Sequence, residues 1–278
     1  MPQKQAEKYL KHLSDLATIS PVAVELISKV EDINVSRDEI AQLVKKDDVL
    51  YTNVFKLVNS AALGLPRRVQ NILEAINIIG MFQLRSLTFM IAAKKVFVDL
   101  DLWYKSVFLA FSAEKIAQEL GLNQNFQSDV YISGLMMSSG QLIFKMFYRD
   151  QYKDIDAILN YQERLKAEKA IFGISSIELS CEIIKNYGLP ETIYSILSKQ
   201  DLDWQDEEFG LANAILKLAC ILAELDSKNM DQFELKRTIG DLLDPDLLKK
   251  FQMSELRLDT DFLAQLHEGT ATFVNANH

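Results

Sequence analysis

The amino-acid sequence predicts an all-α fold without a β-sheet, and three observations support this. Glycine and proline, the residues that turn the chain in β-rich folds, number only 10 and 5 among 278 residues. Apolar residues recur at helical spacing, whereas strict two-residue alternation never extends over more than a few residues. Helix start and stop signals flank many of these apolar segments. We therefore expect about a dozen or more short helices.

Helix starts are visible at four places along the chain. Ser20 puts a capping hydroxyl before Pro21, and proline suits the first helical position because its missing N–H would be unpaired there. Residues 36–39 (SRDE) and 175–178 (SSIE) have the spacing of a capping box. Residues 244–245 (DP) predict a further start by the same logic as Ser20 and Pro21.

Helix ends are marked mainly by glycine. Gly121 follows the long periodic segment 103–120, and Gly188 follows the segment 177–187. Glycine adopts the left-handed conformation that closes many helices. The short apolar segment 132–137 fits either a strand or a helix, because its period does not distinguish the two.

Charge and composition exclude several functional classes. A formal net charge of −9 disfavours nucleic-acid binding, because such a protein repels a phosphate backbone. The longest apolar stretches fall short of the roughly 20 residues that span a bilayer, and the first residues lack a secretory signal, so we expect no membrane insertion and a cytoplasmic protein. Cys181 and Cys220 are expected to be reduced, buried side chains rather than nucleophiles.

Several ordered segments resemble a known family. Residues 47–61 (DDVLYTNVFKLVNSA) are similar to the DPxLxxxLLxLANSA segment of HDOD domains, and residues 64–67 (GLPR) follow in the register of that family. Further matches, such as 134–142 (GLMMSSGQL) and 188–190 (GLP), extend the resemblance over roughly residues 10–225. The HDOD family is a degenerate branch of the HD phosphohydrolase superfamily.

The resemblance implies the arrangement of the chain. An N-terminal helical lobe, residues 1–98, is expected to pack on an HD-like helical bundle, residues 99–225. Residues 226–278 would form a C-terminal helical extension outside the family's pattern. The family also implies a regulatory role in bacterial signal transduction.

The resemblance also indicates where a catalytic metal would be held in an active HD phosphohydrolase. Such a metal needs several imidazole and carboxylate ligands to polarise a phosphoryl oxygen and activate water. The matching positions in this chain are Lys105, Met137, Ser138, Ser176, Gln200 and Asp201. We therefore expect a vestigial site with no metal, no catalytic residue and no cofactor.

The other chemistry-bearing residues support this expectation. The three histidines, His12, His267 and His278, lie in terminal segments, and we interpret them as surface or capping residues. No standard phosphate-binding loop or nucleophile elbow is present. The acidic segment 201–208 lacks EF-hand spacing and is interpreted as a solvated loop rather than a cation site.

Two features outside the vestigial site have a structural and a functional interpretation. A group of basic residues could contact an anion or a partner, although we favour a solvated loop with an ion pair to Glu74 or Asp48; these residues are Lys56, Arg67, Arg68 and Arg85. The other feature consists of family-motif residues, which we interpret as structural rather than ligand-binding: Asn59, Ser60, Gly64, Pro66 and Gly80.

The sequence thus favours a non-catalytic signal-transduction module that acts through contacts with an unidentified signalling protein. A first alternative is a sensor of a nucleotide or cyclic dinucleotide, in which Lys105 supplies a positive charge within the remnant cleft. A second alternative is a residual metal-dependent phosphohydrolase, which would need ligands other than those carried over above.

Overall fold

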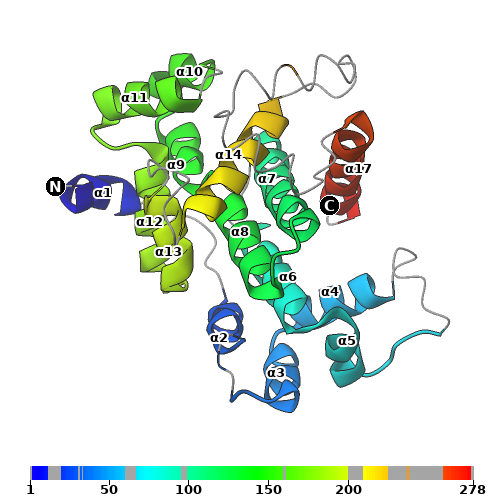
Figure 1. Cartoon of the computed structure of the whole chain (residues 1–278). Coiled ribbons are helices and arrows are strands. Elements are labelled where there is room, and N and C mark those ends of the chain that lie inside the picture. The colour runs from blue at the N-terminus through cyan, green and yellow to red at the C-terminus, as the bar shows by residue number, and fades with distance from the viewer. Residues whose placement is uncertain are drawn as a thin grey trace.

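The computed structural model describes residues 2–11, 20–30, 32, 34–59, 67–94, 99–158, 161–199, 209–224, 237 and 259–276. Within these ranges the chain forms helices joined by turns and contains no strand (Figure 1). The predicted all-α class is therefore confirmed.

The helices before residue 99 are α1 (Pro2–Leu10), α2 (Pro21–Lys29), α3 (Arg37–Val44), α4 (Asp48–Val58), α5 (Ile72–Ile79) and α6 (Met81–Lys94). The following helices are α7 (Leu100–Glu119), α8 (Gln124–Met136), α9 (Ser139–Phe147), α10 (Arg149–Asp156), α11 (Tyr161–Phe172), α12 (Ser176–Asn186), α13 (Glu191–Ser198) and α14 (Gly210–Glu224). The described part of the C-terminal extension contains α17 (Thr260–Ala276).

The predicted helix signals are confirmed wherever the chain is described. The Ser20 hydroxyl accepts a hydrogen bond from the Ala23 N–H at 3.1 Å. Both capping boxes are present, at the starts of α3 and α12. Gly121 and Gly188 adopt positive φ angles of 69° and 65°. The ambiguous segment 132–137 is helical up to Met136, where α8 ends, and the predicted start at 244–245 lies outside the described residues.

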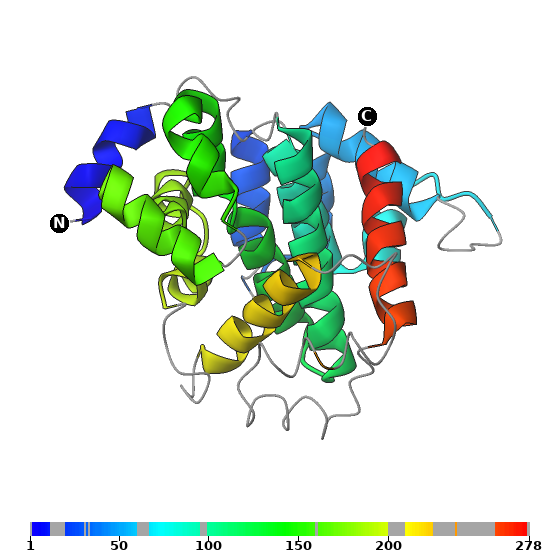
Figure 2. The ribbon, with the colours of Figure 1, turned by 90° about the horizontal axis from the view of Figure 1, so that it is seen from above.

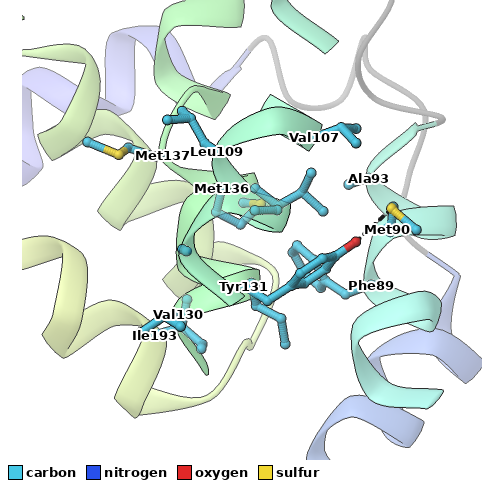
Figure 3. Packing of buried hydrophobic residues seen from close by; sticks show 14 of the residues in the cluster. Phe89, Met90, Ala93, Val107, Leu109, Val130, Tyr131, Met136, Met137 and Ile193 are labelled. Carbon is cyan, nitrogen blue, oxygen red and sulfur yellow. Dashed lines mark hydrogen bonds between the residues drawn. The ribbon is translucent and has the colours of Figure 1, made fainter. Parts of the chain in front are cut away.

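The centre of the molecule is the contact of α8 with α6 and α7 (Figure 3). The Tyr131 side chain on α8 is buried, and its hydroxyl donates to the Met90 sulfur on α6 at 2.7 Å. Helix α14 packs on both α7 and α8. Helix α8 therefore joins elements from both of the predicted lobes.

Helix α1 packs against α12 rather than against α2 to α6 (Figure 1). The Tyr9 hydroxyl donates to the Phe172 carbonyl at 2.8 Å, and the Tyr9 ring contacts Phe144 and Tyr148 edge-on. The predicted division at residues 98 and 99 stays a prediction, but the first helix of the chain lies on helices that follow it.

No single helix among the described residues is long and apolar enough to cross a bilayer. Helices α5 and α6 reach that length and apolar composition only when taken together, and the chain bends by 104° between them.

Candidate functional site

Two of the segments that carry vestigial HD positions meet where α9 packs on α12. The Gly140 N–H donates to the Ser180 hydroxyl at 2.8 Å, and that hydroxyl donates to the Met137 carbonyl at 3.1 Å. A Cβ atom on Gly140 would lie 2.0 Å from the Ser176 carbonyl oxygen. Glycine is thus required at position 140, because only it permits this approach. The structure therefore brings the segment of Met137 close to Ser176.

Lys105 belongs to the helical hairpin of α7 and α8. The hairpin helices are in close contact where Gly134 faces Leu109: a Cβ atom on Gly134 would lie 3.0 Å from the Leu109 carbonyl carbon. Lys105 precedes this contact by about one turn, and Met137 follows it by about one turn. The half-buried Lys105 therefore lies at the same end of the hairpin as Met137. Gln200 and Asp201 lie outside the described residues.

Three of the positions carried over from the HD resemblance, 137, 138 and 176, have sulfur or hydroxyl side chains. The Cys220 thiol lies 3.7 Å from the Met137 thioether sulfur, and both side chains are buried. Ser138 and Ser176 are buried as well. Among the described residues, no three His, Cys, Asp or Glu side chains gather in a way that could hold a metal ion. These groups do not fit the imidazole and carboxylate shell of an HD metal.

The Glu168 carboxylate lies beside Ser176 and accepts hydrogen bonds from groups within the protein. Glu168 on α11 is fully buried; it accepts the Tyr152 hydroxyl at 2.7 Å and the Ser176 N–H at 2.6 Å. Burial, reinforced by Glu168, raises the pKa of Tyr152, so this hydroxyl stays a donor. Spacing within α11 does not predict this role of Glu168, because its partners come from α10 and α12.

Both cysteines are free, buried side chains, as the sequence predicts. Burial, together with the charge of Glu182, raises the pKa of Cys181 to about 12. Burial also raises the pKa of Tyr161, and the nearby Cys220 adds to that shift. Since the thiolate is the reactive form of cysteine, Cys181 is unsuited to nucleophilic or metal chemistry at neutral pH.

The HDOD family model matches residues 16–202. The chain belongs to the HDOD family. Members of this family are related to the HD phosphohydrolases.

Solved structures show the same HDOD fold. An HDOD protein of unknown function from Geobacter sulfurreducens is 20% identical, with a TM-score of 0.69 over 99% of this chain and 97% of that chain. A candidate phosphohydrolase from Shewanella amazonensis SB2B is also 20% identical, with a TM-score of 0.65 over 95% of this chain and 93% of that chain. An uncharacterized protein of Treponema pallidum (strain Nichols) is 24% identical over 202 residues, which are 70% of this chain and 39% of the relative.

The prediction that Arg85 belongs to a group of basic contact residues is wrong. Its side chain is only 1% exposed, and its guanidinium pairs with Asp129 on α8 at 2.8 Å. The sequence did not show this, because residues on all sides of this part of α6 are buried and the helix has no distinct polar face. Arg85 therefore holds α6 on α8 and is not available to an external anion.

The other basic residues of that group are exposed. Arg67 pairs with Glu74, which confirms the ion pair favoured from the sequence. Lys56 on α4 has an exposed side chain, and so does Arg68, which follows Arg67 in the chain. These positions remain open to contact with a partner.

Asn59 acts as a structural clamp at the end of α4, as predicted. Its side-chain amide donates to the carbonyls of Phe55 at 3.0 Å and Val69 at 3.1 Å. Its carbonyl oxygen accepts the Val69 N–H at 2.7 Å. Asn59 thereby joins the two ends of the connection between α4 and α5. The associated motif residues Ser60, Gly64 and Pro66 lie outside the described residues.

Gly80 also has the structural role expected of it. It has a φ of 81°, and its N–H donates to the Ile76 carbonyl to end α5. This left-handed conformation favours glycine and permits the sharp turn into α6.

The interpretation of the histidines as surface or capping residues is wrong for His267. It is half-buried on α17, with its Nδ1 3.1 Å from the Tyr104 hydroxyl and its ring 4.5 Å from that of Phe108. The reason is that α17 packs along α7 (Figure 2), a contact between distant parts of the sequence. His12 and His278 lie outside the described residues.

Proposed function

We propose that this HDOD protein is a non-catalytic regulatory module that acts through contacts with another protein. The supporting observation is the contact of Met137 with Cys220, at the place where an HD phosphohydrolase would hold its metal with histidine and aspartate. A thioether and a thiol are not the imidazole and carboxylate ligands with which HD phosphohydrolases hold a divalent cation that activates water.

The absence of catalysis is tested with nucleotides and cyclic dinucleotides in the presence of Mg²⁺, Mn²⁺ or Fe²⁺. We expect no hydrolysis above the rate of buffer with the same metal. Metal-dependent hydrolysis that Ser138→Ala abolishes would overturn the proposal, provided that the variant keeps its melting temperature. Thr192→Ala is the matched control, since it removes an exposed hydroxyl from α13.

Exposed apolar side chains on α4 and α5 support a protein-contact surface. Val49 is 44% exposed and Ile78 is 40% exposed, and their helices contact each other. Exposed Lys56 and Arg68 add positive charge to the same part of the chain. Apolar side chains bordered by charged residues are typical of interaction surfaces.

This surface is tested by photo-crosslinking in the host cell. A crosslinking amino acid replaces Ile78 in one variant and the exposed Asp101 in a control variant. We expect one discrete crosslinked protein from position 78 and none from position 101. Equal crosslinking at both positions, or none at either, would count against this surface.

A cavity between α11, α12 and α13 favours a second candidate function, that of a small-ligand sensor. Its volume is about 280 Å³, and its lining includes Lys166, Lys169 and Ser175. Lys169 pairs with Glu178 at 3.1 Å, so Lys166 supplies the uncompensated charge. The volume lies at the lower limit of ligand pockets, roughly 300–1,000 Å³, and favours a small anion over a cyclic dinucleotide.

The sensor function is tested by thermal shift with mononucleotides and cyclic dinucleotides at millimolar concentration. A stabilisation by mononucleotides that Lys166→Gln removes would support it. Lys153→Gln is the control, because Lys153 is an exposed cation outside this cavity. No shift with any nucleotide would exclude a nucleotide sensor at these concentrations.

A further inference from the structure

A groove lies between α7 and the C-terminal helix α17, apart from the vestigial site. Its volume is about 240 Å³. Phe111, Phe262 and Leu266 give it an apolar lining, and Gly269 contributes no side chain. The polar side chains that line the groove are Glu114, Lys115, Gln118 and Gln265. The groove thus combines aromatic surface with one acidic and one basic group.

Glu114 has fewer hydrogen-bond donors than a carboxylate can accept. Gln83 donates to its Oε1 at 2.7 Å, and no other hydrogen bond reaches this carboxyl group from the described residues. Burial and the Glu114 charge raise the pKa of Tyr131. The Tyr131 hydroxyl donates to the Met90 sulfur and not to Glu114. Burial raises the pKa of Glu114 against the opposing effect of Gln83. A carboxylate has about four acceptor positions, so Glu114 can accept further donors.

The basic residue of the groove does not neutralise Glu114. Lys115 pairs with Glu119 one turn further along α7, at 2.8 Å. The charge of Lys115 is therefore balanced by another carboxylate. This leaves Glu114 as the uncompensated charge among the side chains that line the groove.

We propose that this groove binds an organic cation of the guanidinium or ammonium class, with its charged head at Glu114 and its apolar stem along Phe111 and Phe262. The N–H groups of such a head make charge-assisted hydrogen bonds to a carboxylate. Aromatic rings attract cations and also provide apolar contact for the stem. The cation is either a free small molecule or an arginine or lysine side chain of another protein. This proposal does not rest on the proposed regulatory function.

The experiment measures binding of butylguanidinium by calorimetry, with neutral butylurea as the matched compound. We expect butylguanidinium to bind at least tenfold more tightly than butylurea, and Glu114→Gln to remove this preference. Asp101→Asn is the control: it removes one negative charge from an exposed position on α7 and should change the affinity by less than twofold. Equal binding of the two compounds to the unaltered protein would overturn the proposal.

A second variant tests the same groove without altering its charge. A Cβ atom on Gly269 would meet nothing within 4 Å, so Gly269→Leu can extend into open space and fill the groove. We expect it to weaken butylguanidinium binding at least tenfold while the protein stays folded. This variant decides the matter if Glu114→Gln fails to fold, and undiminished binding to folded Gly269→Leu would overturn the proposal.

The source of the cation is distinguished by a blocked pentapeptide with one central arginine. Binding at least tenfold tighter than that of butylguanidinium, and lost in Gly269→Leu, would indicate a protein side chain. Weaker binding of the peptide, together with Glu114-dependent binding of butylguanidinium, would indicate a free small cation.

Discussion

Gly140 and Ser176 are in such close contact that a methyl group on Gly140 would lie 2.0 Å from the Ser176 carbonyl oxygen. This contact joins α9 to α12, directly after the Met137–Ser138 pair. The approach of two backbones without a side chain between them holds these two segments together. The contact of α9 with α12 therefore depends on close backbone packing.

The first prediction concerns this contact. Gly140→Ala should lower the free energy of unfolding by about 3 kcal/mol or more, because overpacking typically costs about 1–3 kcal/mol and here the obstructing atoms belong to the backbone. Urea denaturation measures the change. Gly134→Ala, whose Cβ would lie 3.0 Å from the Leu109 backbone, should cost less. A Gly140→Ala protein as stable as the original would contradict this geometry.

The second prediction compares two glycines whose Cβ positions are both open. Gly269 lies inside α17, where Gly269→Ala should stabilise the protein by about 0.5–1 kcal/mol, because alanine loses less backbone entropy in a helix. Gly121 has a φ of 69°, so Gly121→Ala should destabilise it by about 1–2 kcal/mol. Thermal unfolding of both variants should give shifts of opposite sign, and shifts of the same sign would show that this account is wrong.

The third prediction concerns the buried ion pair of Arg85 and Asp129. Arg85→Met should cost about 3–5 kcal/mol, because it leaves the largely buried Asp129 carboxylate without its counter-charge. Burial already raises the pKa of Asp129 despite the opposing effect of Arg85, so desolvation outweighs the attraction. The double variant Arg85→Met/Asp129→Leu should therefore recover much of the loss. Chemical denaturation of the two variants checks this, and a double variant no more stable than the single one would refute it.

The fourth prediction concerns pH and the capping box of α12. Burial alone would raise the pKa of Glu178, but hydrogen bonds from Ser175 and the charge of Lys169 lower it overall. A carboxylate with a lowered pKa stabilises the fold above its unfolded pKa, near 4.3, and this contribution disappears as the pH falls through the folded value. Glu178→Gln keeps the capping geometry but cannot ionise.

Stability curves from pH 7 to pH 2 test this fourth prediction. The original protein should be more stable than Glu178→Gln at pH 7, and the two should converge below pH 4. Glu182→Gln serves as the control on the same helix, since Glu182 lies outside the capping box. A difference that stays constant down to pH 2 would show that ionisation of Glu178 does not contribute.

Local signals predicted the helices well because they depend on neighbours in the sequence. The Ser36 and Ser175 capping boxes and the closing glycines Gly121 and Gly188 were all readable from spacing. Asn59 was also interpreted correctly, since its partners Phe55 and Val69 belong to the adjoining helix and loop. For such residues the interacting groups lie within about ten positions of one another.

Contacts between distant helices were not predictable in the same way. Arg85 was grouped with basic residues of a solvated loop that could contact an anion or a partner, but it is buried and pairs with Asp129 on α8. Glu168 was given no role, although it joins Tyr152 to the start of α12. In each case the partner's identity depends on how helices pack, which no periodicity within one segment specifies.

The sequence by itself determined the helical class and the helix caps, because each of these follows from residue type and local spacing. Only the tertiary structure decided that Met137 lies against Cys220, that α17 covers α7 beside His267, and that Glu114 lines a groove. The physical reason is that side-chain burial and pairing between helices arise only when distant segments pack together.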